Sequence, residues 1–155
     1  MPVPLLRKDF ILDELQILEA RAAGASAVLL IVRALPLSRL RDLLAVARDL
    51  GLDALVEAHD AQELAVALET DARFLGVNSR NLDTFAIDVD AAWALLTTIP
   101  PGRVAIAESG MASEADVRKA ADAGADGVLI GTALSGAADP SGLARAVSSL
   151  PRTGR

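Results

Sequence analysis

The apolar residues of this sequence gather into short runs separated by longer stretches of mixed polarity. The runs are aliphatic and continuous, without the alternation of apolar and polar residues expected of a half-exposed strand. Continuous runs of this kind are typical of strands buried on both faces of a parallel sheet. The runs predicted as strands are residues 5–6, 27–32, 55–56, 74–77, 104–107 and 128–130.

The stretches between these runs carry helical signals. Between residues 37 and 50 the apolar positions recur at steps of three and four, which places them on one face of a helix. Gly24, Gly51 and Gly124 stand where helices should end and the chain must turn with positive φ. Helix starts are predicted at pairs with capping-box spacing, namely Asp13 with Gln16, Asp60 with Glu63, and Ser113 with Asp116.

These elements form about six β–α units, which predicts a parallel sheet with helical crossovers. A closed barrel and an open doubly wound sheet both fit this pattern. Residues 23–30 and 123–130 resemble each other four units apart, which favours duplicated half-barrels, although Ala-Gly-Ala suits any tight helix-to-strand turn equally well. We expect one domain at residues 1–150 and a C-terminal tail at 151–155.

Composition narrows the classes of function. The 155 residues are 52% hydrophobic and 23% charged, as in a globular domain. A net charge of −6 without a basic cluster predicts no nucleic-acid partner. The absence of cysteine excludes disulfides, and a single histidine without clustered ligands predicts no metal. With no signal peptide or membrane-length apolar stretch, we expect no membrane partner and a cytoplasmic location.

Polar residues recur where the predicted strands end, which is where β/α barrels hold their working residues. Lys8 follows the first run and could donate a proton if it loses solvent, although a surface lysine fits as well. Glu57 and Glu108 follow later runs and could act as a general base or stabilise charge, or could equally cap their strands. His59 lies past its strand without metal partners, so we expect a structural role.

The later strands end in residues suited to an anionic ligand. Asn78 and Arg80 fall in a predicted loop, where they could bind a carboxylate or hydroxyl group or simply form a turn. Ser109-Gly110 and Gly131-Thr132 close the last two runs. Glycine allows close backbone approach, and phosphate binding after the last two strands recurs in such barrels.

Together these residues resemble the indole-3-glycerol phosphate synthase family, a TIM (β/α)8 barrel, over about residues 4–146. The resemblance implies strands three to eight of that barrel. The motifs that carry it are Leu6-Arg7-Lys8-Asp9-Phe10, the segment 19–25, Leu55-Val56-Glu57-Ala58-His59-Asp60, Gly76-Val77-Asn78-Ser79-Arg80-Asn81-Leu82, Ala107-Glu108-Ser109-Gly110 and the segment 129–134.

The resemblance implies an activity and a set of roles. The family closes the indole ring of 1-(2-carboxyphenylamino)-1-deoxyribulose 5-phosphate, releasing carbon dioxide and water, and uses no cofactor. Lys8 would be a general acid and Glu57 a general base. The substrate site would be shaped by Asn78, Arg80, Glu108 and Ser109, and the phosphate held by Gly110, Gly131 and Thr132.

The sequence departs from the family in ways that affect activity. The family has two earlier strands and an N-terminal extension, and its first strand supplies another catalytic Lys, a Glu and a Ser-containing substrate loop. None of these is present here. Ser79 replaces a usual Asn, and Glu14-Leu15 replaces a Pro-Tyr pair. We therefore expect the chain, whether a fragment, a late-started gene model or a piece of a split enzyme, to be inactive alone.

Two partners follow from the missing strands, because sheet edges at residues 5–6 and 128–130 would pair with the missing N-terminal barrel segment or with a second copy. The alternatives are another phosphate-binding barrel, such as phosphoribosylanthranilate isomerase, or a non-catalytic ligand-binding fragment. The pairing of Lys8 with Glu57 favours the synthase.

Overall fold

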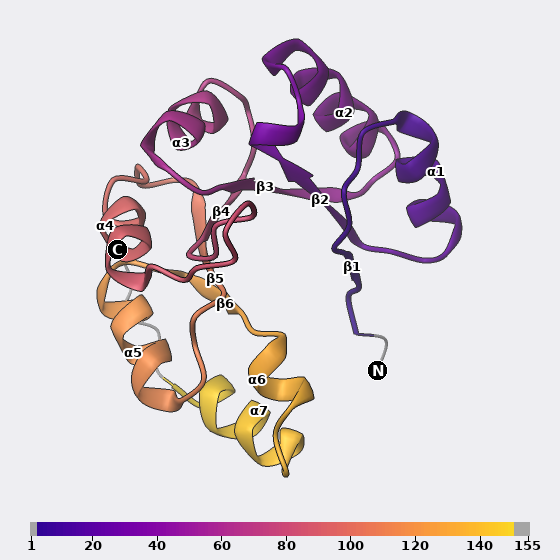
Figure 1. The fold of residues 1–155 in the computed structure, drawn as a ribbon. Helices are drawn as coiled ribbons and strands as arrows, with labels where there is room; N and C mark the ends of the chain where they lie inside the picture. The colour runs from indigo at the N-terminus through magenta and orange to yellow at the C-terminus, as the bar shows by residue number, and fades with distance from the viewer. Residues whose placement is uncertain (1–2, 151–155) are drawn as a thin grey trace. The chain divides into compact units, whose positions relative to one another are not determined.

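The computed structural model describes residues 3–150, in which six strands alternate with helices along the chain (Figure 1). This succession confirms the prediction of an incomplete TIM-type α/β fold with six β–α units in the described range. Two compact units divide the chain, unit 1 at Met1–Leu75 and unit 2 at Gly76–Arg155, with the boundary inside β4 (Phe74–Asn78). A single domain at 1–150 stays a prediction, and the expected tail at 151–155 lies outside the described residues.

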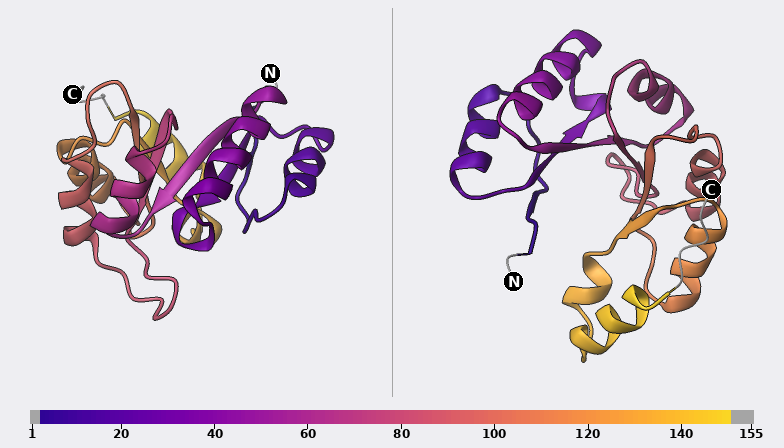
Figure 2. Two further views of the ribbon diagram at one scale, coloured as in Figure 1. Left: turned by 90° about the horizontal axis from the view of Figure 1, so that it is seen from above. Right: turned by 180° about the vertical axis from the view of Figure 1, so that it is seen from behind.

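Unit 1 contains three parallel strands in chain order, β1 (Leu6–Arg7), β2 (Ala27–Ile31) and β3 (Asp53–Ala58). Its helices are α1 (Glu14–Ala22), the short 3-10 helix η1 (Val32–Ala34), α2 (Leu37–Asp49) and α3 (Ala61–Leu68). Helices α1, α2 and α3 lie on the same side of these strands (Figure 1), and Figure 2 shows the chain from above and from behind. Because the strands are parallel, their carboxyl ends meet at one edge of the sheet.

The core of unit 1 follows from its hydrophobic pattern. Residues 28–31 of β2 are all buried, as predicted for a strand covered on both faces. The predicted face of α2 packs on β2 and β3 through Leu40, Leu43, Leu44 and Ala47, all buried. Burying a leucine side chain contributes about 1.5–3 kcal/mol, so this face fixes α2 against the sheet.

Unit 2 begins within β4 at Gly76 and continues in chain order with β5 (Val104–Glu108) and β6 (Gly127–Leu129). The strands β5 and β6 are parallel, with Glu108 opposite Leu129. Helix α4 (Val89–Leu96) packs on β5 and α5 (Glu114–Asp122) packs on β6. Helices α6 (Thr132–Ser135) and α7 (Pro140–Ser148) complete the unit.

The helix-to-strand turns share one geometry. Gly24, Gly51 and Gly124 have φ of 88°, 68° and 94°, as their positions predicted. In each turn the amide after the glycine donates to a carbonyl in the last helical turn, at 2.9, 2.9 and 3.0 Å respectively. This pattern is the Schellman motif, which satisfies carbonyl groups that a helix end leaves open.

Two of the three predicted capping boxes are complete. Asp13 with Gln16 and Ser113 with Asp116 make both reciprocal hydrogen bonds. At the start of α3, Asp60 accepts from the amide of Glu63 at 2.8 Å, but the Glu63 carboxylate bonds elsewhere. Within residues 3–150, no helix has both the length and the apolar character needed to cross a bilayer.

Candidate functional site

Lys8 and Glu57 meet at the carboxyl end of the strands of unit 1. Lys8 directly follows β1, and Glu57 is the penultimate residue of β3, in register with Ile31 of β2. Lys8 Nζ donates to Glu57 Oε2 at 2.8 Å. The Glu57 side chain is 1% exposed while that of Lys8 is 37% exposed. A buried carboxylate is thus paired with an ammonium group that a ligand can reach.

A second set of side chains approaches Glu57 at Oε1, whereas Lys8 Nζ contacts Oε2. The sequence did not predict this set as part of the site. His59 Nε2 is 3.2 Å from Glu57 Oε1, an ion-pair distance. On the other side, His59 Nδ1 is 2.9 Å from Glu63 Oε2. Arg33 Nε donates to Glu63 Oε1 at 2.7 Å. These contacts form a charge row in which cationic and anionic groups alternate, in the order Lys8, Glu57, His59, Glu63 and Arg33. The structural role predicted for His59 thus includes a contact with Glu57, a candidate site residue.

The charges in this row shift the pKa values of His59 and Glu63. Burial lowers the pKa of His59, but contacts with Glu57 and Glu63 outweigh it and raise the pKa from 6.5 to about 9. Burial raises the pKa of the Glu63 carboxyl, but hydrogen bonds from His59 and Arg33 outweigh it and hold the pKa below its ordinary value. At neutral pH the imidazole is accordingly protonated between two carboxylates.

The raised pKa of His59 predicts a pH dependence of stability. A group whose pKa is higher in the folded state stabilises fully below its unfolded pKa, and this contribution is lost as pH rises through the folded value. The free energy of unfolding should therefore fall between pH 6.5 and about 9, by on the order of 1–3 kcal/mol. Urea unfolding across this range checks it. His59→Gln should flatten the dependence, and an unchanged slope in that variant would contradict the assignment.

In unit 2, Asn78 and Ser79 are fixed by backbone hydrogen bonds. Asn78 is the last residue of β4 and is buried, so the predicted loop position is wrong for it. Its Oδ1 accepts from the Arg80 amide at 3.0 Å. The Ser79 amide and hydroxyl both donate to the Glu108 carbonyl, at 3.0 and 3.2 Å. These contacts hold the end of β4 beside the end of β5.

Backbone conformation at the end of β5 is unusual. Glu108 is fully buried, and the next two residues, Ser109 and Gly110, have φ of 66° and 71°. A non-glycine residue at positive φ is strained, and such strain gathers at ligand sites. The segment 79–89 packs closely over Gly110, because a Cβ there would lie 2.5 Å from Val89 Cγ1 and 2.8 Å from Ser79 Oγ.

The strand register brings the last two predicted loops together. Glu108 pairs with Leu129, and the Ser109 amide donates to the Leu129 carbonyl at 3.4 Å. Gly131 is the N-cap of α6, and Thr132 begins that helix. The loops that follow β5 and β6 therefore lie side by side. Within residues 3–150, no group of three or more His, Asp or Glu side chains is placed to hold a metal ion.

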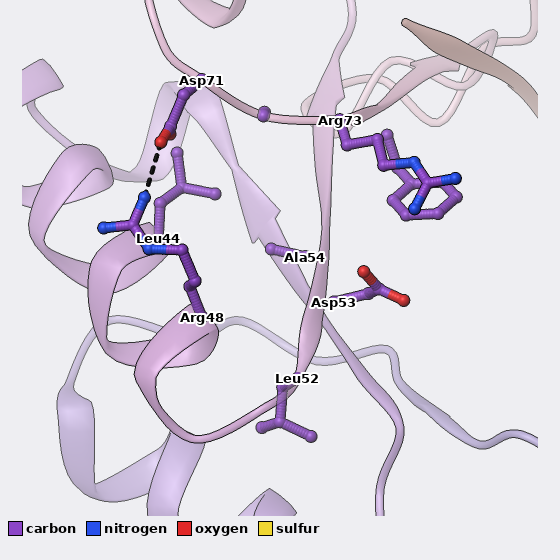
Figure 3. Close-up of a pocket in the computed structure, with 9 residues that line it drawn as sticks. Leu44, Arg48, Leu52, Asp53, Ala54, Asp71 and Arg73 are labelled. Atoms are coloured by element: carbon purple, nitrogen blue, oxygen red, sulfur yellow. Dashed lines mark hydrogen bonds and ion pairs between the residues drawn. The ribbon is translucent and has the colours of Figure 1, made fainter.

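A cavity of about 160 Å³ lies elsewhere in unit 1 (Figure 3). Asp53 and Ala54 line it at the amino end of β3, the opposite end from Glu57. Arg48 and Asp71, also in its wall, bond to each other at 2.8 Å (Figure 3). The cavity is thus separate from the predicted site residues.

Comparison with known proteins identifies the family. The model of the indole-3-glycerol phosphate synthase family matches residues 1–147. The indole-3-glycerol phosphate synthase of Chlorobium phaeovibrioides is 51% identical over 132 residues, which are 85% of this chain and 51% of that protein. Indole-3-glycerol phosphate synthase 2 of Streptomyces coelicolor is 51% identical over 138 residues, covering 89% of this chain and 54% of that protein. The chain thus spans about half the length of the curated relatives it matches.

Solved structures agree on the fold. The 3-hexulose-6-phosphate synthase of Salmonella typhimurium superposes with a TM-score of 0.78 at 22% identity, over 94% of this chain and 71% of that one. Orotidine 5'-phosphate decarboxylase from Pyrococcus horikoshii gives 0.69 at 17% identity, over 94% and 72%. These similarities concern the fold alone, whereas the family match covers nearly the whole sequence. The chain belongs to the indole-3-glycerol phosphate synthase family.

Proposed function

We propose that this chain supplies the acid–base pair and part of the substrate site of an indole-3-glycerol phosphate synthase. The reaction closes the indole ring of 1-(2-carboxyphenylamino)-1-deoxyribulose 5-phosphate and releases one carbon dioxide and one water. The observation that carries the proposal is the 2.8 Å contact between Lys8 Nζ and Glu57 Oε2. A proton donor and an acceptor stand side by side where strands of this fold end.

The chemistry needs both partners. In ring closure, the aromatic carbon that bears the carboxylate bonds to the ketose carbonyl carbon, and the carbonyl oxygen takes up a proton. Lys8 is the donor, because its ammonium group is partly exposed beside a carboxylate. Loss of carbon dioxide restores the aromatic ring. Loss of water then requires a proton delivered to the leaving hydroxyl and a proton removed from the ring system, and Glu57 is the acceptor for the latter.

The remaining site residues complete the substrate site in this proposal. Asn78, Arg80, Glu108 and Ser109 orient the substrate, and the fixed positions of Asn78 and Ser79 beside the end of β5 support this assignment. The positive φ of Ser109 supports it further, because strained backbone is retained where a ligand needs it. We place the reaction in the cytoplasm on the basis of the family.

We propose that Gly110, Gly131 and Thr132 hold the substrate phosphate. The adjacency of the loops after β5 and β6 supports a shared set of backbone N–H donors. Titration of the ¹⁵N-labelled chain with inorganic phosphate should shift the amides of Ser109, Gly110, Gly131 and Thr132 first. Sodium chloride at matched ionic strength is the control. Shifts confined to other residues would refute the placement.

The partner in this proposal is the N-terminal barrel segment of the family, which would pair with β1, or in its absence a second copy of this chain. Large exposed apolar side chains support an interface here, because most of those in the described range lie within the first eighteen residues. They are Val3, Leu5, Phe10, Leu12, Leu15 and Leu18. Apolar side chains gathered beside an unpaired strand edge favour association.

The test of the function is turnover, followed by the fluorescence of the indole product. The chain alone should show no appreciable activity. A completed chain, made by joining it to the N-terminal portion of the Streptomyces coelicolor relative, should turn over substrate. Removing one member of a cooperating catalytic set lowers rates by orders of magnitude. Turnover by the chain alone near that of the full-length relative, or none by a folded completed chain, would overturn the proposal.

A further inference from the structure

The proposed reaction gives no task to His59, although its ring lies against Glu57. The His59 side chain is 3% exposed, and each of its ring nitrogens lies within 3.2 Å of a glutamate carboxylate, so neither nitrogen is directed to a ligand. Anything it contributes to the site must therefore act through a neighbour. Its ring nitrogens face Glu57 on one side and Glu63 on the other.

The imidazole ring is fixed from several elements. Glu63 Oε2 accepts from the His59 backbone amide at 2.8 Å and lies 2.9 Å from Nδ1 of the same residue. Glu63 is itself held by Arg33 of η1 and by the cap contact with Asp60 at the start of α3. With Nδ1 held in this way, Nε2 is directed toward Glu57 Oε1, 3.2 Å away. A ring held on one edge sets where its other edge points.

The position of the Glu63 carboxylate supports a specific use. A glutamate at this place in α3 would ordinarily complete the capping box with Asp60. Here its oxygens contact His59 and Arg33 instead. The start of α3 therefore lacks the reciprocal capping interaction, and the Glu63 carboxylate, held by Arg33, clamps the imidazole of His59 instead.

The charged groups around His59 explain how its imidazole can affect the ionisation of Glu57. Glu57 of β3 and Glu63 of α3 face the ring directly, while Lys8 and Arg33 contact the far oxygens of those carboxylates. A protonated imidazole between two carboxylates favours the ionised form of both. The raised pKa of His59 agrees with this arrangement.

We propose that His59, clamped by Glu63 and Arg33, is a positioning residue that holds the Glu57 carboxylate ionised and aimed at Lys8. Glu57 Oε1 is occupied by the imidazole, so Oε2 is the oxygen directed to Lys8. This inference rests on the proposed function for its meaning in catalysis. Its physical content concerns the ionisation of Glu57 and is measurable without any turnover.

The test is a carboxyl ¹³C titration of Glu57 by NMR in the chain as it exists. In His59→Gln, which keeps a donor but removes the charge, Glu57 should titrate at a higher pH than in the parent. In Glu63→Gln, which removes one of the two carboxylates that face the ring, His59 should titrate below its parent value of about 9. Asp71→Asn, which breaks the surface pair with Arg48 in the same unit, is the matched control and should leave both titrations unchanged.

An unchanged Glu57 titration in His59→Gln, with a folded spectrum, would overturn the inference and leave His59 a packing residue. If His59→Gln does not fold, Glu63→Gln decides alone, because it retains the imidazole: an unchanged His59 titration in that variant would show that Glu63 does not hold the ring and would overturn the inference. In the completed chain, His59→Gln should lower kcat by up to about 10²-fold with KM little changed, since misaimed groups lose rate and not binding. A completed chain without activity would refute the proposed function, while the titration would still judge the positioning role.

Discussion

Replacing Glu57 with Gln in the completed chain should lower kcat by about 10²–10⁴-fold, the usual effect of losing a general base. The amide keeps the size of the side chain but cannot accept the proton that must leave during dehydration. It also leaves Lys8 Nζ without the carboxylate that lies 2.8 Å away in the parent. Product fluorescence under saturating substrate measures the change. KM should change far less than kcat, because the buried Glu57 side chain offers a ligand little surface.

The matched comparisons separate catalysis from folding. Lys8→Ala should produce a loss in the same range, since it removes the other partner of the pair. Glu114→Gln, on the exposed first turn of α5, disrupts only the surface contact with Arg118 and should retain full activity. A Glu57→Gln enzyme with near-parent kcat would remove the carboxylate from the mechanism. Thermal melts of all three variants establish that they are folded.

Gly110→Ala should destabilise the protein by at least about 2 kcal/mol, because two penalties add at one position. The residue has φ of 71°, where a side chain costs about 1–3 kcal/mol. The new methyl group would also lie 2.5 Å from Val89 Cγ1 and 2.8 Å from Ser79 Oγ, and overpacking typically costs another 1–3 kcal/mol. Urea unfolding measures the difference in free energy.

Gly102→Ala is the natural control for that prediction. Gly102 lies in the same unit and has φ of 94°, but nothing lies within 4 Å of a Cβ built there. It therefore carries the conformational penalty without the contacts. Equal losses in the two variants would show that the segment 79–89 does not pack on Gly110 as described. A larger loss at Gly110 measures that packing directly.

Much of the fold could be predicted because burial and hydrophobicity coincide in it. The run at 27–32 became β2 with its last residue passing into η1, and the face between 37 and 50 became α2. The bounds of β3 were less predictable, since hydrogen bonding to β2 defines a strand and this bonding includes Asp53 and Glu57. A polar residue can mark a place where a ligand or a cap is needed, but the strand can continue through that residue.

The position of a candidate site residue was predictable where a polar residue comes at the end of a single predicted strand. Lys8 and Glu57 come from β1 and β3, on either side of β2, and they meet because parallel strands bring their carboxyl ends to one edge of the sheet. His59 was not recognised as part of their surroundings, because its partners Glu63 and Arg33 come from a helix and a 3-10 turn that hydrophobic periodicity does not align. Asn78 was predicted in a loop because asparagine is favoured in turns, whereas the structure places it, buried, at the end of β4.

The shared turns after α1, α2 and α5 bear on how such a chain can be reshuffled. Ala23-Gly24-Ala25 and Ala123-Gly124-Ala125 have like sequences, but Leu50-Gly51-Leu52 makes the same hydrogen-bonded turn with different neighbours. The likeness of the first two therefore needs no more than a common local geometry, whatever their ancestry. A genetic crossover inside any of these turns would join a helix to a strand through a turn of the same backbone geometry. These turns are therefore the points where whole β–α units can be exchanged at the least conformational cost.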